Sequence, residues 1–299
     1  MLKYRLISFP LLLLLAFAVV FWQPYGSAVF MILALPITLA VILESCNIAG
    51  KLQLPVHRCL AIFAGVLLLG KYGYGIVMPE KLSALPGLAK AMSYTVCTLP
   101  GLAGIMIFVF TILMLKTLFC REANKHLAVI CAFVTPGVIL FAMLPVVTLV
   151  AIYLKYGALI FLSLVLATKA SDTGGYIVGM LSNKLMKNGN HKIVPSISPK
   201  KSWEGTIGAA LFSIGVTALL AHCNCIKLGT AEIFIFGFLA FLGSFAGDLT
   251  ESQLKRAAGI KDSANWIPGM GGILDVLDSF IYNAPLFYLA LESGVLVCQ

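Results

Sequence analysis

Residues 247–278, GDLTESQLKRAAGIKDSANWIPGMGGILDVLD, form the most polar stretch of an otherwise very apolar chain. The whole sequence has five Asp residues, and four of them (Asp248, Asp262, Asp275 and Asp278) lie in this stretch. Asp275 and Asp278 are three residues apart, so on a helix they share a face about one turn apart. Two carboxylates at that spacing repel each other unless they are protonated or share a cation. The stretch therefore predicts a cation site.

Basic side chains stand in the same stretch, ahead of the last two carboxylates. Lys255, Arg256 and Lys261 are of the type that binds phosphate oxygens. Carboxylates for a hard cation, close to bases for phosphate, are the components of metal-assisted phosphoryl or nucleotidyl transfer. This combination indicates an enzyme that acts on a phosphorylated substrate.

The composition excludes an ordinary soluble domain. The chain has 299 residues, of which 60% are hydrophobic and 11% are charged, and its mean hydropathy is +1.00. Soluble proteins contain about 25% charged residues. Apolar runs close to 20 residues long recur along the whole chain, which favours membrane spans over buried core helices. We therefore expect an all-α, polytopic integral membrane protein.

The apolar runs predict about nine transmembrane helices. They cover residues 6–22, 28–43, 59–78, 94–119, 127–150, 156–169, 203–221, 231–246 and 273–297. The first run is too long for a signal peptide, and no small-residue cleavage site follows it, so it is interpreted as a retained helix.

The basic residues predict the orientation of these spans. With the N-terminus in the cytoplasm, sixteen Lys and Arg residues fall in inner loops and five in outer loops. Both polar regions of the C-terminal half then face the cytoplasm. The net charge of +9 is explained by this bias and by anionic lipid headgroups, so no nucleic-acid partner is expected.

Residues 1–168 are expected to be a transmembrane scaffold, and residues 169–299 the catalytic region. The acidic side chains of the first part are Glu44, Glu80 and Glu122, all close to predicted span ends, and they form no recognisable catalytic set. The eight Cys residues are scattered and predict no disulfide framework. Cys223 and Cys225 have no second pair, so they are not interpreted as a zinc site.

A second polar region covers residues 169–205. Asp172 lies at the expected inner end of a span, where an Asp is often only a cap or an interfacial charge. Downstream of it is the segment SPKKSWEG, residues 198–205. The intervening loop contains His191, which is interpreted as an ordinary loop residue.

Together these two regions resemble the phosphatidate cytidylyltransferases, also called CDP-diacylglycerol synthases. The resemblance covers roughly residues 168–283 and includes the S-P-K-K-[ST]-x-E-G segment. Two positions depart from the family's usual pattern: Met270 replaces a common His, and Val276 replaces a common Arg. The signature positions are Ser252, Lys255, Arg256, Lys261, Asp262, Pro268, Gly269, Gly271, Gly272, Asp275 and Asp278.

The resemblance implies the reaction of CTP with phosphatidate to give CDP-diacylglycerol and pyrophosphate. It implies Mg²⁺ held by Asp248, Asp275 and Asp278, with a second cation as an alternative stoichiometry. The expected catalytic residues are these three with Lys255 and Arg256. The expected substrate-binding residues are Asp172, Ser198, Lys200, Lys201, Glu204, Lys261, Asp262, Gly269, Gly271 and Gly272.

The expected partners are CTP, phosphatidate and the lipid bilayer, and the resemblance also implies a homodimer. The expected location is the cell (inner) membrane, as a multi-pass protein with the active site facing the cytoplasm. The departures at Met270 and Val276 are expected to be tolerated, because the attacking phosphate is already ionised and needs little help from a base.

Two other protein classes share some of these features. An ion-coupled secondary transporter also has intramembrane carboxylates, but the chain has no internal repeat and clusters its acids with bases. An alcohol phosphatidyltransferase would need a D-G-x-x-A-R stretch, which this sequence lacks.

Overall fold

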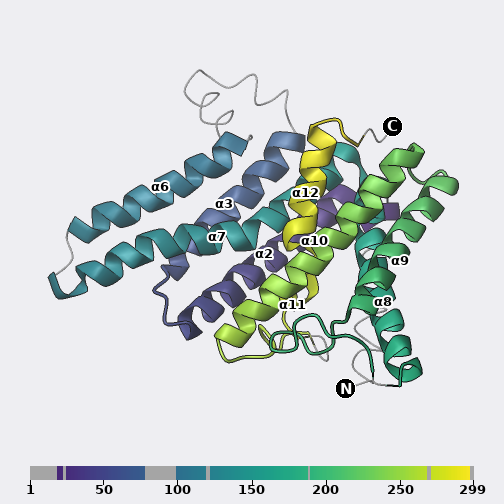
Figure 1. The fold of residues 1–299 in the computed structure, drawn as a ribbon. Coiled ribbons are helices and arrows are strands. Elements are labelled where there is room, and N and C mark those ends of the chain that lie inside the picture. The colour runs from purple at the N-terminus through teal and green to yellow at the C-terminus, as the bar shows by residue number, and fades with distance from the viewer. Residues whose placement is uncertain are drawn as a thin grey trace. The chain divides into compact units, whose positions relative to one another are not determined.

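The structure, a computed structural model, describes residues 19–22, 25–77, 99–118, 122–187, 189–267 and 271–296. Throughout these residues the regular structure is helical, apart from two isolated β-bridges, so the all-α prediction is confirmed (Figure 1). The helices are α2 (Gly26–Lys51), α3 (Arg58–Val77), α6 (Leu99–Leu118), α7 (Glu122–Tyr156), α8 (Ala158–Leu185), α9 (Trp203–His222), α10 (Thr230–Ala257), α11 (Ile273–Leu277) and α12 (Phe280–Glu292).

Four of these helices are long and apolar enough to cross a membrane. They are Gly26–Lys51, Asn124–Tyr156, Trp203–His222 and Thr230–Ala257, and they contain the spans predicted at 28–43, 127–150, 203–221 and 231–246. Apolar stretches of α3 and α6 are described over Arg58–Gly70 and Ile105–Leu118. The span predicted at 6–22 lies mostly outside the described residues. A membrane protein is confirmed, and the count of nine stays a prediction.

Two elements differ from the predicted spans. Helix α8 continues to Leu185, well past the predicted end at residue 169, so Asp172 lies inside a helix rather than at its end. The span predicted at 273–297 is interrupted: α11 ends at Leu277, and a turn at Asp278 and Ser279 precedes α12. The Asp278 carboxylate accepts a hydrogen bond from the Ser279 amide at 2.5 Å. Asp and Ser favour such turns because their side chains compete for backbone groups.

The chain divides into two compact units. The first contains Met1–Lys155 and Ala257–Asp275, and the second contains Tyr156–Arg256 and Val276–Gln299. In the first unit α2 packs on α3, with Ile42 and Leu68 fully buried. In the second unit α8 and α9 lie side by side (Figure 1). The division of function between residues 1–168 and 169–299 stays a prediction.

Glycines allow the helices of the second unit to approach closely. A Cβ on Gly174 of α8 would lie 2.5 Å from the Cβ of Phe212 on α9. A Cβ on Gly243 of α10 would lie 2.5 Å from the Cα of Asn283 on α12. Small residues at such crossings are the usual way in which membrane helices gain contact area. These close crossings hold α8, α9, α10 and α12 around the polar side chains described below.

We predict that Gly243→Ala destabilises the protein, because the added methyl overlaps the backbone of α12. Overpacking of this kind costs about 1–3 kcal/mol, which would lower the thermal midpoint measured in detergent. The matched control is Gly215→Ala on α9, where a Cβ meets no atom within 4 Å among the described residues. Equal midpoints for the two variants would contradict the close α10–α12 crossing.

Candidate active site

The second unit contains a cavity of about 470 Å³. Its wall is formed by α8, by the loop before α9 and the first turns of α9, by α10 and by the turn that follows α11. Six side chains predicted from the sequence line it: Asp172, Ser198, Lys200, Lys201, Asp248 and Asp278. The structure therefore brings together six predicted residues from both polar regions.

The start of α9 places two of the cavity lysines. Ser202 is the N-cap of α9, and its Oγ accepts a hydrogen bond from the Gly205 amide at 3.1 Å, as Ser typically does at this position. Lys200 and Lys201 immediately precede this cap. An isolated antiparallel bridge pairs Lys192 with Ser202, which folds the preceding loop back and brings Lys192 into the cavity wall.

Lys201 is held against α10 by three contacts. Its Nζ lies 2.9 Å from Asp248 Oδ2, donates to the carbonyl oxygen of Phe245 at 3.2 Å, and lies 4.2 Å from the centre of the Phe245 ring. An ammonium over an aromatic face is itself a favourable contact. The charge of Asp248 is thus balanced by a lysine from the α9 cap.

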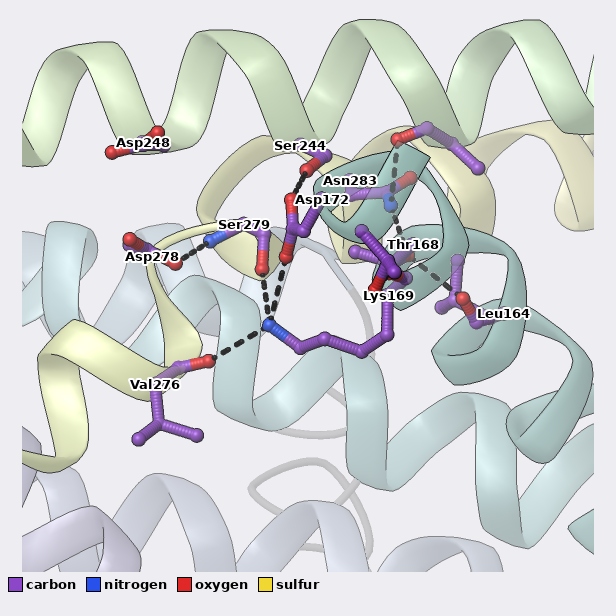
Figure 2. A network of polar contacts seen from close by, with 12 residues as sticks. Leu164, Thr168, Lys169, Asp172, Ser244, Asp248, Val276, Asp278, Ser279 and Asn283 are labelled. Carbon is purple, nitrogen blue, oxygen red and sulfur yellow. Dashed lines mark hydrogen bonds and ion pairs between the residues drawn. The ribbon is translucent and has the colours of Figure 1, made fainter. Parts of the chain in front are cut away.

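Lys169 of α8 is the centre of a second set of contacts (Figure 2). Its Nζ lies 3.1 Å from Asp172 Oδ2, 2.8 Å from Ser279 Oγ and 3.4 Å from the carbonyl oxygen of Val276. The other oxygen of Asp172 accepts a hydrogen bond from Ser244 Oγ of α10 at 2.5 Å. Asp172 and Lys169 thereby connect α8 with α10 and with the turn after α11. Lys169 thus brings a positive charge to the backbone of Val276, the position at which the sequence departs from the expected Arg.

A further buried hydrogen bond supports this network. Asn283 of α12 is fully buried, and its amide nitrogen contacts Thr168 Oγ1 of α8. The same nitrogen donates to the carbonyl oxygen of Ala240 on α10 at 3.2 Å. Because a buried amide is costly to leave without partners, this contact favours one arrangement of the three helices.

Asp278 carries the most perturbed charge in the cavity. Its pKa is raised to about 7, mainly because burial penalises the charged form, and further because Asp248 and Asp172 repel it. The nearby Lys169 and the hydrogen bond from the Ser279 amide act in the opposite direction. Such a shift, caused by burial and like charges, is typical of carboxylates that serve a functional site.

Three other predicted residues of the second unit have partners elsewhere. Glu204 accepts from the His191 ring at 2.7 Å and from the His191 amide, so it holds the loop that precedes α9. Lys255 forms an ion pair with Glu251 one turn before it on α10. Arg256 Nε donates to the carbonyl oxygen of Ile197 at 3.4 Å. Their proposed contacts with substrate stay predictions.

The remaining predicted residues belong to the first unit or lie outside the described residues. Lys261 and Asp262 are exposed there. Asp275 Oδ2 accepts hydrogen bonds from the Ser263 amide at 2.9 Å, from Ser263 Oγ at 2.8 Å and from the Gly272 amide at 2.7 Å. Gly271 and Gly272 belong to the same segment, with Gly271 at φ +95°. Gly269 and Met270 are outside the described residues.

Three residues of the site, Lys169, Lys192 and Ser244, were not among those predicted from the sequence. The spacing of Lys169 and Asp172, three residues apart on a helix, is a signal for an ion pair. The pair was not predicted because the span was expected to end at residue 169, which would have left Asp172 outside the helix. Ser244 offered no signal, since an isolated Ser in an apolar run is usually a packing residue.

The cavity residues suit a hard cation in their chemistry. Within the described ranges, no three His, Cys, Asp or Glu side chains are already gathered tightly enough to form a metal site. The carboxylates of Asp172, Asp248 and Asp278 nevertheless line one cavity and supply only oxygen ligands, which Mg²⁺ prefers. Burial is the main cause of the raised pKa of Asp278, and a cation would relieve the repulsion from Asp248 and Asp172 that adds to it.

Known proteins share extensive similarity with this chain. The model of the "Cytidylyltransferase family" matches residues 3–293. A protein named phosphatidate cytidylyltransferase 4, chloroplastic, from Arabidopsis thaliana is 42% identical over 126 residues, which are 42% of this chain and 30% of that protein. Proteins named phosphatidate cytidylyltransferase from Mycobacterium bovis and Haemophilus influenzae are 41% identical over 129 residues and 37% identical over 136 residues.

These alignments cover 43% and 44% of this chain, and 40% and 45% of the two bacterial proteins. The chain thus spans less than half the length of the curated relatives that it matches. None of these similarities supports the ion-coupled transporter.

We predict that Asp278 makes the stability of the protein depend on pH. In the unfolded chain an Asp has a pKa of about 3.9, whereas in the folded protein the pKa of Asp278 is about 7. The folded state therefore binds the additional proton, and this contribution to stability is lost as the pH rises from about 4 to about 7. In detergent with EDTA, the thermal midpoint should fall more steeply over this range in the wild type than in Asp278→Asn. Parallel profiles would contradict the raised pKa.

Proposed function

Because the chain belongs to the cytidylyltransferase family, we propose that it transfers the cytidylyl group of CTP to phosphatidate, producing CDP-diacylglycerol and pyrophosphate. Relatives named phosphatidate cytidylyltransferase in Arabidopsis, Mycobacterium and Haemophilus support this substrate pair. The observation that carries the proposal is the cavity of the second unit, which is lined by three carboxylates and three lysines. They are Asp172, Asp248, Asp278, Lys192, Lys200 and Lys201.

In the proposed reaction an oxygen of the phosphatidate phosphate attacks the α-phosphorus of CTP. The new bond joins the two phosphates, and the bond from the α-phosphorus to the bridging oxygen of the β-phosphate breaks. The electron pair of that bond leaves with pyrophosphate. The attacking phosphate monoester is mostly a dianion near neutral pH, so a strong general base is not required. The chief difficulty is the repulsion between two anions.

The lysines of the cavity address this repulsion. Lys192, Lys200 and Lys201 lie in its wall on the loop before α9 and provide positive charge for the triphosphate and for the lipid phosphate. Lys201 is already oriented by Phe245 and Asp248, so little reorganisation is needed before a phosphate oxygen replaces the carboxylate.

Asp248 and Asp278 are the proposed ligands of Mg²⁺ in this cavity, and Asp172 lies in the same wall. When bound, the cation would neutralise phosphate charge and help to align the attacking and leaving oxygens. Asp275 remains a proposed ligand, although three hydrogen bonds already occupy one of its oxygens. A second cation and a homodimer are further proposals that rest on the family resemblance.

The proposed location is the inner membrane, with the cavity opening to the cytoplasm, where CTP is available. Four candidate spans support a membrane protein. The excess of basic residues in the loops assigned to the inside supports the orientation.

The activity is tested with purified protein, CTP, phosphatidate and Mg²⁺, by measuring pyrophosphate release together with CDP-diacylglycerol formation. We expect Asp248→Asn and Asp278→Asn to lower kcat by about 10²–10³-fold, since each removes charge that acts in the transition state. Product formation should also stop in EDTA and return with Mg²⁺.

The matched control for these variants is Glu232→Gln. Glu232 lies in the first turn of α10, at the opposite end of this helix from Asp248. It should leave kcat unchanged. No product from folded wild-type protein would refute the proposed function. Full activity of Asp248→Asn would remove that residue from the ligand set.

We also predict that the cavity faces the cytoplasm. In a background without native Cys, Lys192→Cys should react with an impermeant maleimide in inside-out vesicles and not in intact cells. Lys227→Cys is the control, because it is exposed in the loop between α9 and α10, which the basic-residue count places outside. It should react in intact cells, and the opposite labelling pattern would reverse the proposed orientation.

A further inference from the structure

Glu44 is a fully buried carboxylate in α2, about two turns before the end of this helix at Lys51. It lies in the half of the sequence that was expected to be only a scaffold. Ionisable residues inside membrane helices are costly and are usually retained for a function. The contacts of Glu44 identify the segment on which it acts.

Both oxygens of Glu44 accept hydrogen bonds from a segment more than two hundred residues later in the chain. Oε1 accepts from the Ile273 amide at 2.9 Å, and Oε2 accepts from the Leu274 amide at 2.8 Å. These are the first two residues of α11, whose amide groups have no partners within the helix. A side chain of α2 thus caps α11, a task usually performed by a residue next to the helix in sequence.

Ser263 extends this contact to Asp275. Its Oγ lies 2.7 Å from Glu44 Oε2 and 2.8 Å from Asp275 Oδ2, so it stands between the two carboxylates. The Gly272 amide donates to the same Asp275 oxygen. The start of α11, the loop residue Ser263 and the Asp275 side chain are therefore held by one set of hydrogen bonds that ends on Glu44.

Gly272 shows how closely these groups are packed. A Cβ at this position would overlap both Ser263 Oγ and the Glu44 carboxylate. Only glycine leaves room for the carboxylate to approach the amides of α11. This gives a reason, independent of any substrate phosphate, for glycine at this position of the signature.

We propose that Glu44 is a positioning residue for the reaction: it fixes the start of α11 and with it Asp275 and Gly272. Glu44 touches no reacting group. It acts through the segment that carries Asp275 and that leads in the chain directly to Asp278. The effect of Glu44 on the reaction rests on the proposed function, whereas its anchoring of α11 through hydrogen bonds does not.

The test compares Glu44→Gln and Glu44→Ala with the wild type in two measurements. The first is hydrogen exchange of the peptide that contains Ile273 and Leu274. Gln keeps the size of the side chain but has one acceptor oxygen for two amides, so exchange should be roughly 10- to 100-fold faster, as expected when a charged acceptor is lost. The second is steady-state kinetics with CTP and phosphatidate. There kcat should fall by about 10- to 100-fold, while KM for CTP stays within about twofold.

The matched control is Ser45→Ala, which changes the adjacent buried polar residue of α2, whose Oγ has no hydrogen-bond partner among the described residues. It should leave both measurements unchanged. Unchanged exchange in Glu44→Gln would overturn the tether. Faster exchange with an unchanged kcat, or an equal change in the control, would overturn the positioning role.

The two arms also separate this inference from the proposed function. A wild type without cytidylyltransferase activity would refute that function and the positioning role together. The exchange measurement would still decide whether Glu44 anchors α11.

Discussion

A carboxylate in an apolar, membrane-spanning chain has to find a cation or N–H groups, because its charge is costly to remove from water. The structure satisfies this requirement in two ways. Asp172 and Asp248 lie beside lysines from α8 and from the α9 cap. Glu44 and Asp275 use backbone amides and the hydroxyl of Ser263. The Lys201–Asp248 pair and the hydrogen bonds of Glu44 connect segments that are distant in the sequence, so these carboxylates help to determine which polar segments meet inside each unit.

The sequence was sufficient for the helical membrane architecture and for most of the cavity. Long apolar runs predicted α2, α7, α9 and α10 because a membrane span needs length and hydropathy, and both can be read directly. Asp248, Lys200 and Lys201 were found because charged residues are rare in this chain and cluster in two segments. Asp172 was identified from the second segment, but its position inside a helix was not predicted.

The sequence did not predict the hydrogen-bonding and packing partners that only tertiary contacts bring together. The extension of α8 depends on glycines that pack against α9, and hydropathy does not report such packing. The helix break at Asp278 comes from a turn that was not predicted, because the residues on either side of it are apolar and read as one continuous span. Glu44 was noticed as an isolated acid, but its partners at Ser263, Ile273 and Leu274 lie more than two hundred residues away. No local pattern could connect them.

The lysine–carboxylate pairs of the cavity have a consequence for how it fills. Lys201 already pairs with Asp248, and Lys169 pairs with Asp172, so two of the three carboxylates that line the cavity have a lysine partner. A nucleotide alone would have to detach lysines and leave carboxylates bare, and a divalent cation alone would leave ammonium groups without partners. Under the proposed function both would enter together, so that the phosphates take the lysines and the cation takes the carboxylates. Each ligand would then raise the affinity for the other by the same factor.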